Sequence, residues 1–369
     1  YICIFIFIIL GIINRNREFK NIPTYFKRTI IIYWLYSIFI IIYGLIFATS
    51  YWNYKNIFIA YVPGVFVSFA IFVGLEFEKN LSLLRFIIKI IFPIASIVGI
   101  ISYLFFYEPF YDFNYDHIVS RLTAPIFFFI LAMPFLKTSH KFFIIFISIF
   151  CLTLDPEWRT NVLRITACWS FVLIYFLFLL KKRLLNFIGI IFFVTPLIFI
   201  YSGISGKFDI FKYMTKDNQG IWGSNTRTFL YQETLWSMKN QGVNFLFGGG
   251  ASAGYQSLAG QHPDSFGEYI RYRSEVGFLN ILLKSGIIGV IFNILIIFIP
   301  AYFAINQSNN NFCKILGSYV AFLWIFSFLE NYQYFNVNYF FIYLIIGLCL
   351  SNTLRKLSDD QIKDFFKSI

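Results

Sequence analysis

In this chain of 369 residues 59% are hydrophobic and only 13% are charged, whereas soluble domains carry about 25% charged residues. With a mean hydropathy of +0.70, this composition excludes an ordinary soluble domain and indicates a polytopic membrane protein. The net charge of +12 fits basic cytoplasmic loops, and we find no basic patch of the kind that binds nucleic acid.

A membrane crossing needs roughly 20 apolar residues, and eleven segments are candidates. We interpret the first segment as a helix that lacks its start, because it is short and has no basic region or cleavage site of a signal peptide. The fifth and sixth segments are also short, and a re-entrant hairpin is the alternative for that pair. In chain order the candidates are 1–13, 29–49, 57–76, 86–106, 121–136, 141–154, 162–180, 184–204, 276–304, 312–330 and 334–352.

The basic residues predict the orientation of these crossings. Of 30 Lys and Arg residues, 17 lie in one alternating set of connections and tails, and only 2 lie in the other set of short connections. Because positive charge marks the cytoplasmic side, the long stretch 205–275 is predicted to be periplasmic. We therefore expect an all-α polytopic membrane protein with about eleven transmembrane helices and one long periplasmic loop that contains short helices. Its parts are a bundle of helices (1–204), the loop (205–275), three further helices (276–352) and a cytoplasmic tail (353–369).

The loop 205–275 holds 10 of the 22 glycines and a nearly balanced set of charges. Residues 226–241 are predicted to form a helix, because capping side chains precede it and Gly242 follows it. The run Gly248–Gly250 allows a backbone to approach either a ligand or another helix closely, but it lacks the Lys and Ser/Thr of a phosphate-binding P-loop. The five cysteines all lie outside this loop, so neither a disulfide framework nor a cysteine metal site is expected there.

Several arginines lie at or near the predicted outer face, against the trend of the other charges. Guanidinium groups bind phosphate oxygens through bidentate hydrogen bonds, so a diphosphate ligand is one explanation, and pairing with lipid headgroups or nearby carboxylates is the other. These residues are Arg121, Arg159, Arg164, Arg227, Arg271 and Arg273.

Two side chains are candidates for a general base. His262 is the only histidine of the loop, and it is either a base or a surface residue beside Pro263. Glu275 stands where the chain returns to apolar sequence; it is either a proton acceptor or an acid placed favourably at a helix N-terminus.

Two other charged features need an explanation. Lys284 lies within the segment 276–304, where a charge is costly, and we expect Glu330 as its partner. The acidic pair in Asp155-Pro156-Glu157 resembles a divalent-cation site next to a lipid diphosphate, although a solvated turn is the simpler interpretation.

The order of these features resembles the O-antigen ligase and polymerase family (Wzy-type polymerases and the lipid A core ligases). That family has many membrane helices, a long periplasmic loop late in the chain, and a loose pattern of an Arg that opens a helix, then Phe-Gly-x-Gly, then a helix ending in Gly-ϕ-ϕ-Gly. Here the pattern is Arg227, Phe247-Gly248-Gly249-Gly250 and Gly286-Ile287-Ile288-Gly289, and Arg159 is similar to an earlier external Arg of the family. Ligases often carry a His-Asn pair where this chain has Glu275-Val276, which favours a polymerase.

The resemblance implies a metal-independent glycosyltransferase of the bacterial inner membrane, with its site facing the periplasm. It would join undecaprenyl-diphosphate-linked repeat units, with no cofactor, in lipopolysaccharide or other polysaccharide synthesis. Glu275 or His262 would be catalytic, and Arg159, Arg164, Arg227, Arg271 and Arg273 would bind substrate. The partners are a lipid-linked donor and acceptor and the bilayer, and the resemblance also allows a chain-length regulator protein. An O-antigen ligase and a flippase for lipid-linked oligosaccharides are the alternatives.

Overall fold

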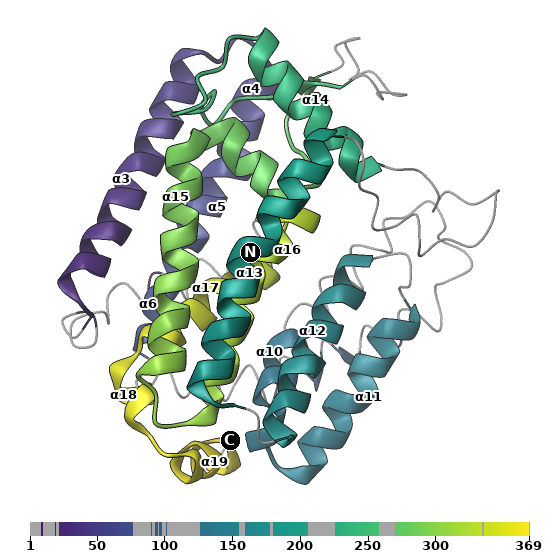
Figure 1. Ribbon diagram of the computed structural model, residues 1–369, viewed down its shortest axis with the longest axis vertical. Coiled ribbons are helices and arrows are strands. Elements are labelled where there is room, and N and C mark those ends of the chain that lie inside the picture. Colours follow the sequence, from purple (N-terminus) through teal and green to yellow (C-terminus); the bar gives the residue numbers. More distant parts are fainter. Residues whose placement is uncertain are drawn as a thin grey trace.

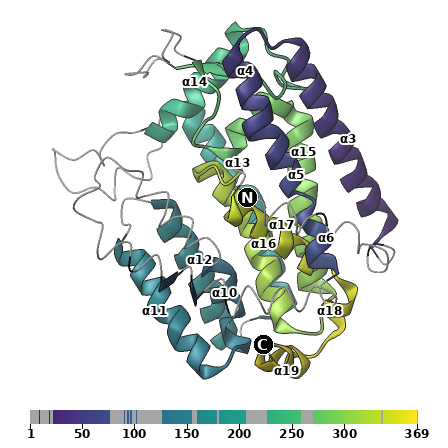
Figure 2. The same cartoon turned by 180° about the vertical axis from the view of Figure 1, so that it is seen from behind.

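The computed structural model describes most of the chain (Figures 1 and 2). Apart from single positions at 9, 19 and between 90 and 101, the described residues are 22–76, 126–154, 159–177, 180–205, 226–257, 270–333 and 336–368. The predicted crossings at 1–13 and 86–106 lie outside these ranges.

The described part of the chain is built from helices, with one pair of very short strands. The first group of helices consists of α3 (Thr24–Ile46), α4 (Tyr51–Lys55), the π-helix η1 (Asn56–Tyr61), α5 (Val62–Val67), α6 (Ala70–Leu75), α10 (Ile126–Ala132), the 3₁₀-helix η3 (Met133–Phe135), α11 (Thr138–Leu154) and α12 (Arg159–Phe176). The second group consists of α13 (Lys182–Ser205), α14 (Thr226–Asn240), α15 (Gly277–Asn306), α16 (Asn311–Leu329), α17 (Val337–Leu350), α18 (Asn352–Lys356) and α19 (Asp359–Ser368). Strands β1 (Tyr255–Gln256) and β2 (Ile270–Arg271) pair antiparallel.

Five stretches of helix are long and apolar enough to cross a membrane. They are Thr24–Ile46, Tyr51–Leu75, Lys182–Tyr201, Gly277–Asn306 and Asn311–Leu329. Shorter apolar helices occur at Ile126–Phe135, Thr138–Leu152, Val162–Phe176 and Val337–Leu350. The prediction of an all-α membrane protein is confirmed at this level, and each of these helices overlaps a segment that the sequence predicts as a crossing.

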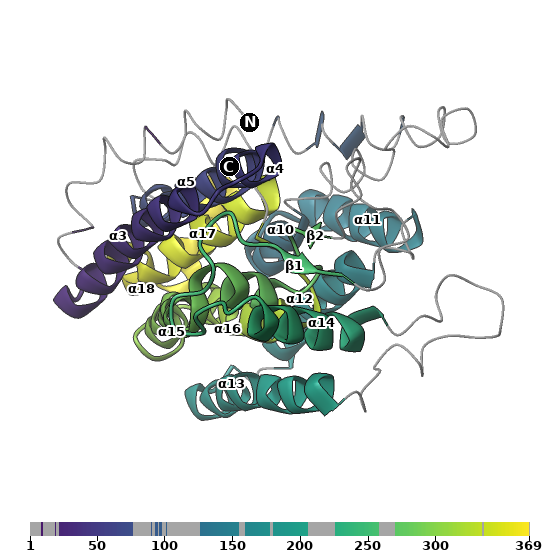
Figure 3. The same ribbon diagram turned by 90° about the horizontal axis from the view of Figure 1, so that it is seen from above.

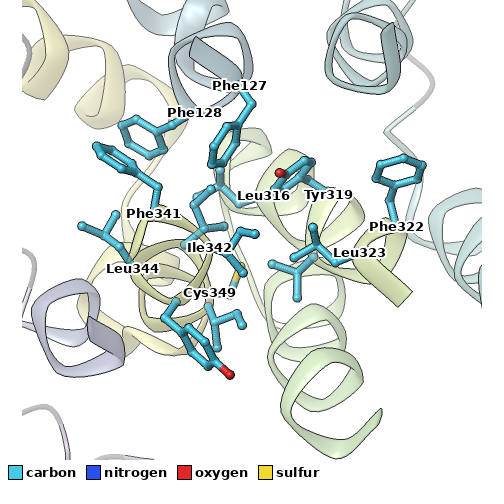
Figure 4. Close-up of a cluster of buried hydrophobic side chains, with 14 of the residues drawn as sticks. Phe127, Phe128, Leu316, Tyr319, Phe322, Leu323, Phe341, Ile342, Leu344 and Cys349 are labelled. Atoms are coloured by element: carbon cyan, nitrogen blue, oxygen red, sulfur yellow. The ribbon is translucent and has the colours of Figure 1, made fainter. Parts of the chain in front are cut away.

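Helix α16 lies at the centre of the bundle. It packs against α15, α13, α17 and α12, and 78% of its apolar stretch is buried. Figure 4 shows the core formed where α10, α16 and α17 meet. There the ring of Phe127 stacks on Tyr319 at 5.3 Å, and Phe128 contacts Phe341 at 5.6 Å between ring centroids. Aromatic pairs at these distances add to the stability gained from burial.

Helices α3 and α13 lie on opposite sides of α15 and α16 (Figure 3). Both present large apolar side chains outward, among them Leu35 and Ile42 on α3, and Phe187 and Leu197 on α13. In water each exposed apolar square ångström costs about 25 cal/mol, so such faces are stable only in an apolar solvent. We therefore assign these faces to the lipid of a bilayer.

The connections of the bundle gather at two opposite ends (Figure 1). At one end Lys182 Nζ donates to the Asn306 carbonyl at 2.8 Å, Arg355 donates to Gln307 at 3.1 Å, and α19 packs against η3. At the other end α14 contacts the last turn of α16, where the Tyr231 hydroxyl donates to the Phe328 carbonyl at 2.8 Å. The first end holds four of the connections and tails that the sequence predicts to be cytoplasmic.

Helices α6 and α17 pack backbone to backbone through Gly74 and Gly347. A Cβ atom on Gly74 would lie 2.8 Å from the Leu348 nitrogen and 2.9 Å from the Gly347 Cα. These distances are too short for a side chain, so the contact requires glycine.

Gly74→Ala is expected to destabilise the bundle by about 1–3 kcal/mol, because the new methyl group overpacks the contact with α17. Gly189→Ala is the matched control, because a Cβ at Gly189 in α13 would meet nothing within 4 Å. Thermal unfolding of the two variants in detergent measures the difference. Equal melting temperatures would show that α6 and α17 do not meet in this way.

Candidate functional site

Helix α15 is interrupted at Gly286, about one third of the way along its length. Its neighbours on both sides are helical, but Gly286 has φ 59° and ψ −163°. This combination of angles is essentially restricted to glycine, because a side chain would collide with the backbone. The break therefore divides α15 into two shorter helices, Gly277–Ser285 and 287–306.

The glycine-rich segment 244–253 supplies the hydrogen bonds that the break removes. The amides of Gly249 and Gly250 donate to the carbonyls of Leu283 and Lys284 at 2.8 and 3.0 Å. Beyond the break, the amides of Ile287 and Ile288 donate to the carbonyls of Phe245 and Leu246, at 2.9 and 3.2 Å. Non-helical backbone at membrane depth is tolerated only where protein or trapped water satisfies it, and here a loop does so.

The two glycine motifs of the sequence meet at this break. A Cβ on Gly248 would lie 2.5 Å from the Lys284 carbonyl carbon, and a Cβ on Gly286 would lie 2.6 Å from the Gly248 nitrogen. The sequence left open whether the glycine run approaches a ligand or another helix. In the structure it lies against a helix.

On the side away from α15, the same loop is bonded to α3 and to the second span, Tyr51–Leu75. The Ala251 amide donates to the Ile40 carbonyl of α3 at 3.1 Å, and the Ser252 hydroxyl donates to the Gly44 carbonyl at 2.9 Å. Asn56, the first residue of η1, donates from its side-chain Nδ2 to the Ala251 carbonyl at 3.0 Å. Hydrogen bonds therefore connect the loop to α3, to the span Tyr51–Leu75 and to α15.

The π-helix η1 belongs to the span Tyr51–Leu75, and its last residue contacts α15 at the break. It ends at Tyr61, whose hydroxyl lies 3.1 Å from the Ser285 hydroxyl. From α3, the Tyr36 hydroxyl donates to the Ser285 carbonyl at 2.6 Å. Two backbone irregularities, the π-helix and the break in α15, therefore converge on one serine, and such irregularities are frequent at functional sites.

A cavity of about 100 Å³ opens beside Ser285. Its lining is rich in hydroxyl and amide groups, and among the described residues it includes two cations but no carboxylate. The lining residues are Tyr33, Tyr36, Ser37, Ala60, Tyr61, Gly64, Val65, Arg273, Asn280, Ile281, Lys284, Ser285, Gly289, Asn293, Asn331, Gln333, Tyr339 and Tyr343. This composition favours an anionic or hydrogen-bonding ligand.

Lys284 is the buried cation of the cavity, with 6% of its surface exposed. Its Nζ lies 5.8 Å from the centroid of the Tyr61 ring, and within the described ranges no carboxylate is close enough to form an ion pair with it. The expected pairing with Glu330 is therefore wrong: Glu330 ends α16, where its carbonyl accepts the Gly277 amide at 3.3 Å.

The predicted residues of the segment 270–275 have different surroundings. Both arginines are exposed, but Arg273 lines the cavity, whereas Arg271 belongs to β2 and faces Tyr255 across the strand pair. Burial raises the pKa of the Tyr255 phenol, and the Arg271 side chain beside it lowers that pKa in part. Glu275 is exposed just before α15 and is not among the lining residues.

Arg164 lies in a different part of the molecule. Only 6% of its surface is exposed, and its guanidinium carbon lies 5.0 Å from the centroid of the Phe127 ring, between α12 and α10. The cavity lining does not include it. A cation against an aromatic face is a stabilising contact in its own right, so this contact helps to pack α12 against α10.

Other predicted residues are described only in part or not at all. Arg159 begins α12 and Arg227 lies in the first turn of α14, but their side chains are outside the described structure. His262 and the acidic pair Asp155 and Glu157 lie outside the described residues altogether.

The predicted helix at 226–241 is confirmed as α14, and its burial reveals a residue that the sequence pattern does not indicate. Glu233 is only 2% exposed, and both of its carboxylate oxygens accept the Ser257 hydroxyl, at 3.3 and 3.2 Å. The Gln256 amide donates to the Ser237 hydroxyl at 2.9 Å, so α14 holds β1 through polar groups. Tyr231, Leu235 and Met238 form an apolar stripe at helical spacing, which predicts packing of this helix but gives no signal for Glu233.

Comparison of the chain with protein-family models, with curated proteins and with solved structures finds no match.

Gly286→Ala is expected to destabilise the protein more than Gly242→Ala. Both glycines have positive φ, 59° and 66°, so alanine costs backbone strain of about 1–3 kcal/mol at either position. Only at Gly286 does the added Cβ also collide with the loop, whereas at Gly242 it meets nothing within 4 Å. Thermal unfolding in detergent tests the order, and equal losses would contradict the contact between the loop and the break.

Proposed function

We propose that this chain is a membrane glycosyltransferase that joins polyprenyl-diphosphate-linked oligosaccharide repeat units, as an O-antigen polymerase does. The observation that carries the proposal is the cationic cavity beside the break in α15. Arg273, one of the predicted diphosphate-binding residues, lines that cavity, and the two motifs of the family resemblance are in backbone contact next to it.

The proposed topology follows from the two ends of the bundle. We place the end with α18 and α19 in the cytoplasm and the end with α14 in the periplasm of a bacterial inner membrane, in agreement with the distribution of Lys and Arg. About eleven crossings are proposed for the whole chain, and the loop 205–275 is its periplasmic part. The cavity then lies near the periplasmic face, where the lipid-linked units would meet.

The reaction is a glycosyl transfer. A hydroxyl oxygen of the incoming unit attacks the anomeric carbon of the growing chain, and the bond from that carbon to the diphosphate oxygen breaks. The diphosphate leaves with the bonding electrons, and the acceptor proton passes to a base, for which Glu275 and His262 remain the candidates. Arginine side chains stabilise the negative charge that develops on the leaving group.

The predicted arginines differ in their surroundings. Arg273 lines the cavity, and it is accordingly the first choice for contact with the leaving diphosphate. Arg271 projects from β2 outside the lining, so its effect is expected to be smaller. For Arg159 and Arg227 the proposal rests on the resemblance alone, and for Arg164 the packing role described above is the simpler assignment.

A transporter of the same lipid-linked units is the second candidate, and one observation favours it. Transporters often build their substrate sites from interrupted membrane helices, and α15 is such a helix. Deletion of the gene separates the candidates through the glycans at the cell surface. Loss of a polymerase leaves single repeat units, loss of a flippase leaves none, and loss of a ligase leaves polymer that is not attached to lipid A.

Arg273→Ala is expected to lower polymer formation about tenfold or more when the variant complements the deletion strain. One charge-assisted hydrogen bond contributes roughly 1.5–3 kcal/mol, which corresponds to about one to two orders of magnitude in rate. Glycan ladders from cells with matched amounts of protein measure the effect.

Arg183→Ala is the control, because Arg183 is exposed near the start of α13, at the opposite end of the bundle. This variant is expected to give ladders of normal length. Normal ladders from Arg273→Ala and also from Arg227→Ala would show that these arginines do not bind the leaving group.

A further inference from the structure

Lys284 needs a counter-charge that the described residues do not provide. A buried ion loses several kcal/mol of hydration, and inside a membrane such groups are paired or mark the path of a substrate. Lys284 is nine-tenths buried, lies about two turns into a membrane helix, and has no ion-pair partner in the described part of the chain.

The described carboxylates that border α15, α16 and α14 do not line the cavity. Glu275 is exposed before α15, and Glu233 is bonded to Ser257. Glu330 ends α16 and is not among the lining residues of the cavity. The described lining therefore combines two cations with hydroxyl and amide groups and contains no acid.

The backbone around Lys284 is fixed in place. The Gly250 amide holds its carbonyl at 3.0 Å, and the next residue, Ser285, is held by Tyr36 and Tyr61. The fixed backbone limits where the ammonium group of Lys284 can lie. A lysine ammonium attracts a phosphate as a point charge and does not require the planar, bidentate geometry of an arginine contact. Arg273, in the same lining, adds a group capable of bidentate contact.

We propose that Lys284 binds a phosphate oxygen of a lipid diphosphate seated at the break in α15, and that Arg273 binds the same anion. This inference rests on the proposed function only in taking the anion to be the diphosphate of a lipid-linked glycan. It adds a substrate-binding residue from within the membrane helix to the arginines expected on the loop.

Binding to the purified full-length protein in detergent tests the proposal. The probes are farnesyl diphosphate, inorganic pyrophosphate and farnesol, and the readout is the ligand-dependent shift in melting temperature across a titration. Lys284→Met keeps the length and apolar stem of the side chain but removes the charge. It is expected to weaken farnesyl diphosphate binding about tenfold or more, because one charge-assisted contact is lost.

Lys314→Met is the matched control. Lys314 is a half-buried lysine of α16 near the opposite end of the bundle, where its Nζ donates to the Asn311 side chain at 3.0 Å. This variant is expected to bind farnesyl diphosphate as the wild type does. Should Lys284→Met fail to fold, Lys284→Gln takes its place, and the wild-type titrations themselves still test whether the cavity takes a diphosphate.

The probes distinguish the sources of the anion. Binding of farnesyl diphosphate much tighter than that of pyrophosphate supports a lipid-borne ligand, and equal binding of the two supports a free phosphate at the same cations. Four results would overturn the proposal. In the wild type they are no binding of either diphosphate, or binding of farnesol as tight as that of farnesyl diphosphate. In the variants they are unchanged farnesyl diphosphate affinity after the Lys284 charge is removed, or binding by the Lys314 variant that is as weak as that by the Lys284 variant. A gene deletion that leaves surface glycans unchanged contradicts the proposed function alone.

Discussion

The exchange of backbone hydrogen bonds between α15 and the segment 244–253 is the interaction on which the rest of the site depends. An interrupted helix within a bilayer exposes amides and carbonyls that lipid cannot satisfy. The glycine run satisfies them because its backbone approaches within contact distance of Lys284 and Gly286. The same loop bonds the Lys284 carbonyl next to Ser285 and accepts the side-chain amide of Asn56 from η1, so this one interaction positions the break and the start of the π-helix beside it.

The sequence predicts the helices well because each crossing is a local property of a run of apolar residues. The segments 276–304 and 312–330 correspond closely to α15 and α16, and 226–241 corresponds to α14. Apolar runs alone do not predict the break at Gly286, since Ser-Gly-Ile-Ile-Gly is compatible with a continuous apolar helix; only the pattern of the family resemblance places a helix end at these glycines. The break depends on a partner loop some 40 residues away, and only the fold brings that loop to the helix.

For the charged residues too, the sequence indicates which side chains are unusual, but only the fold determines what they contact. The sequence singles out Lys284 as a costly charge, but the choice of Glu330 as its partner fails because proximity of helix ends does not direct two side chains toward each other. Arg164 and Arg273 look alike as outward arginines; one lies over the Phe127 ring and the other lines the cavity. Glu233 gives no local signal, because its burial comes from the fold of the loop onto α14.

The break in α15 and the anion site beside it can be observed together in a cryo-EM map of the full chain in lipid nanodiscs with a polyprenyl diphosphate. We expect that α15 leaves helical geometry at Gly286, that the backbone of 244–253 lies against the break, and that phosphate density lies between Arg273 and Lys284. An uninterrupted helix through Gly286, or a diphosphate bound away from both cations, would contradict this expectation.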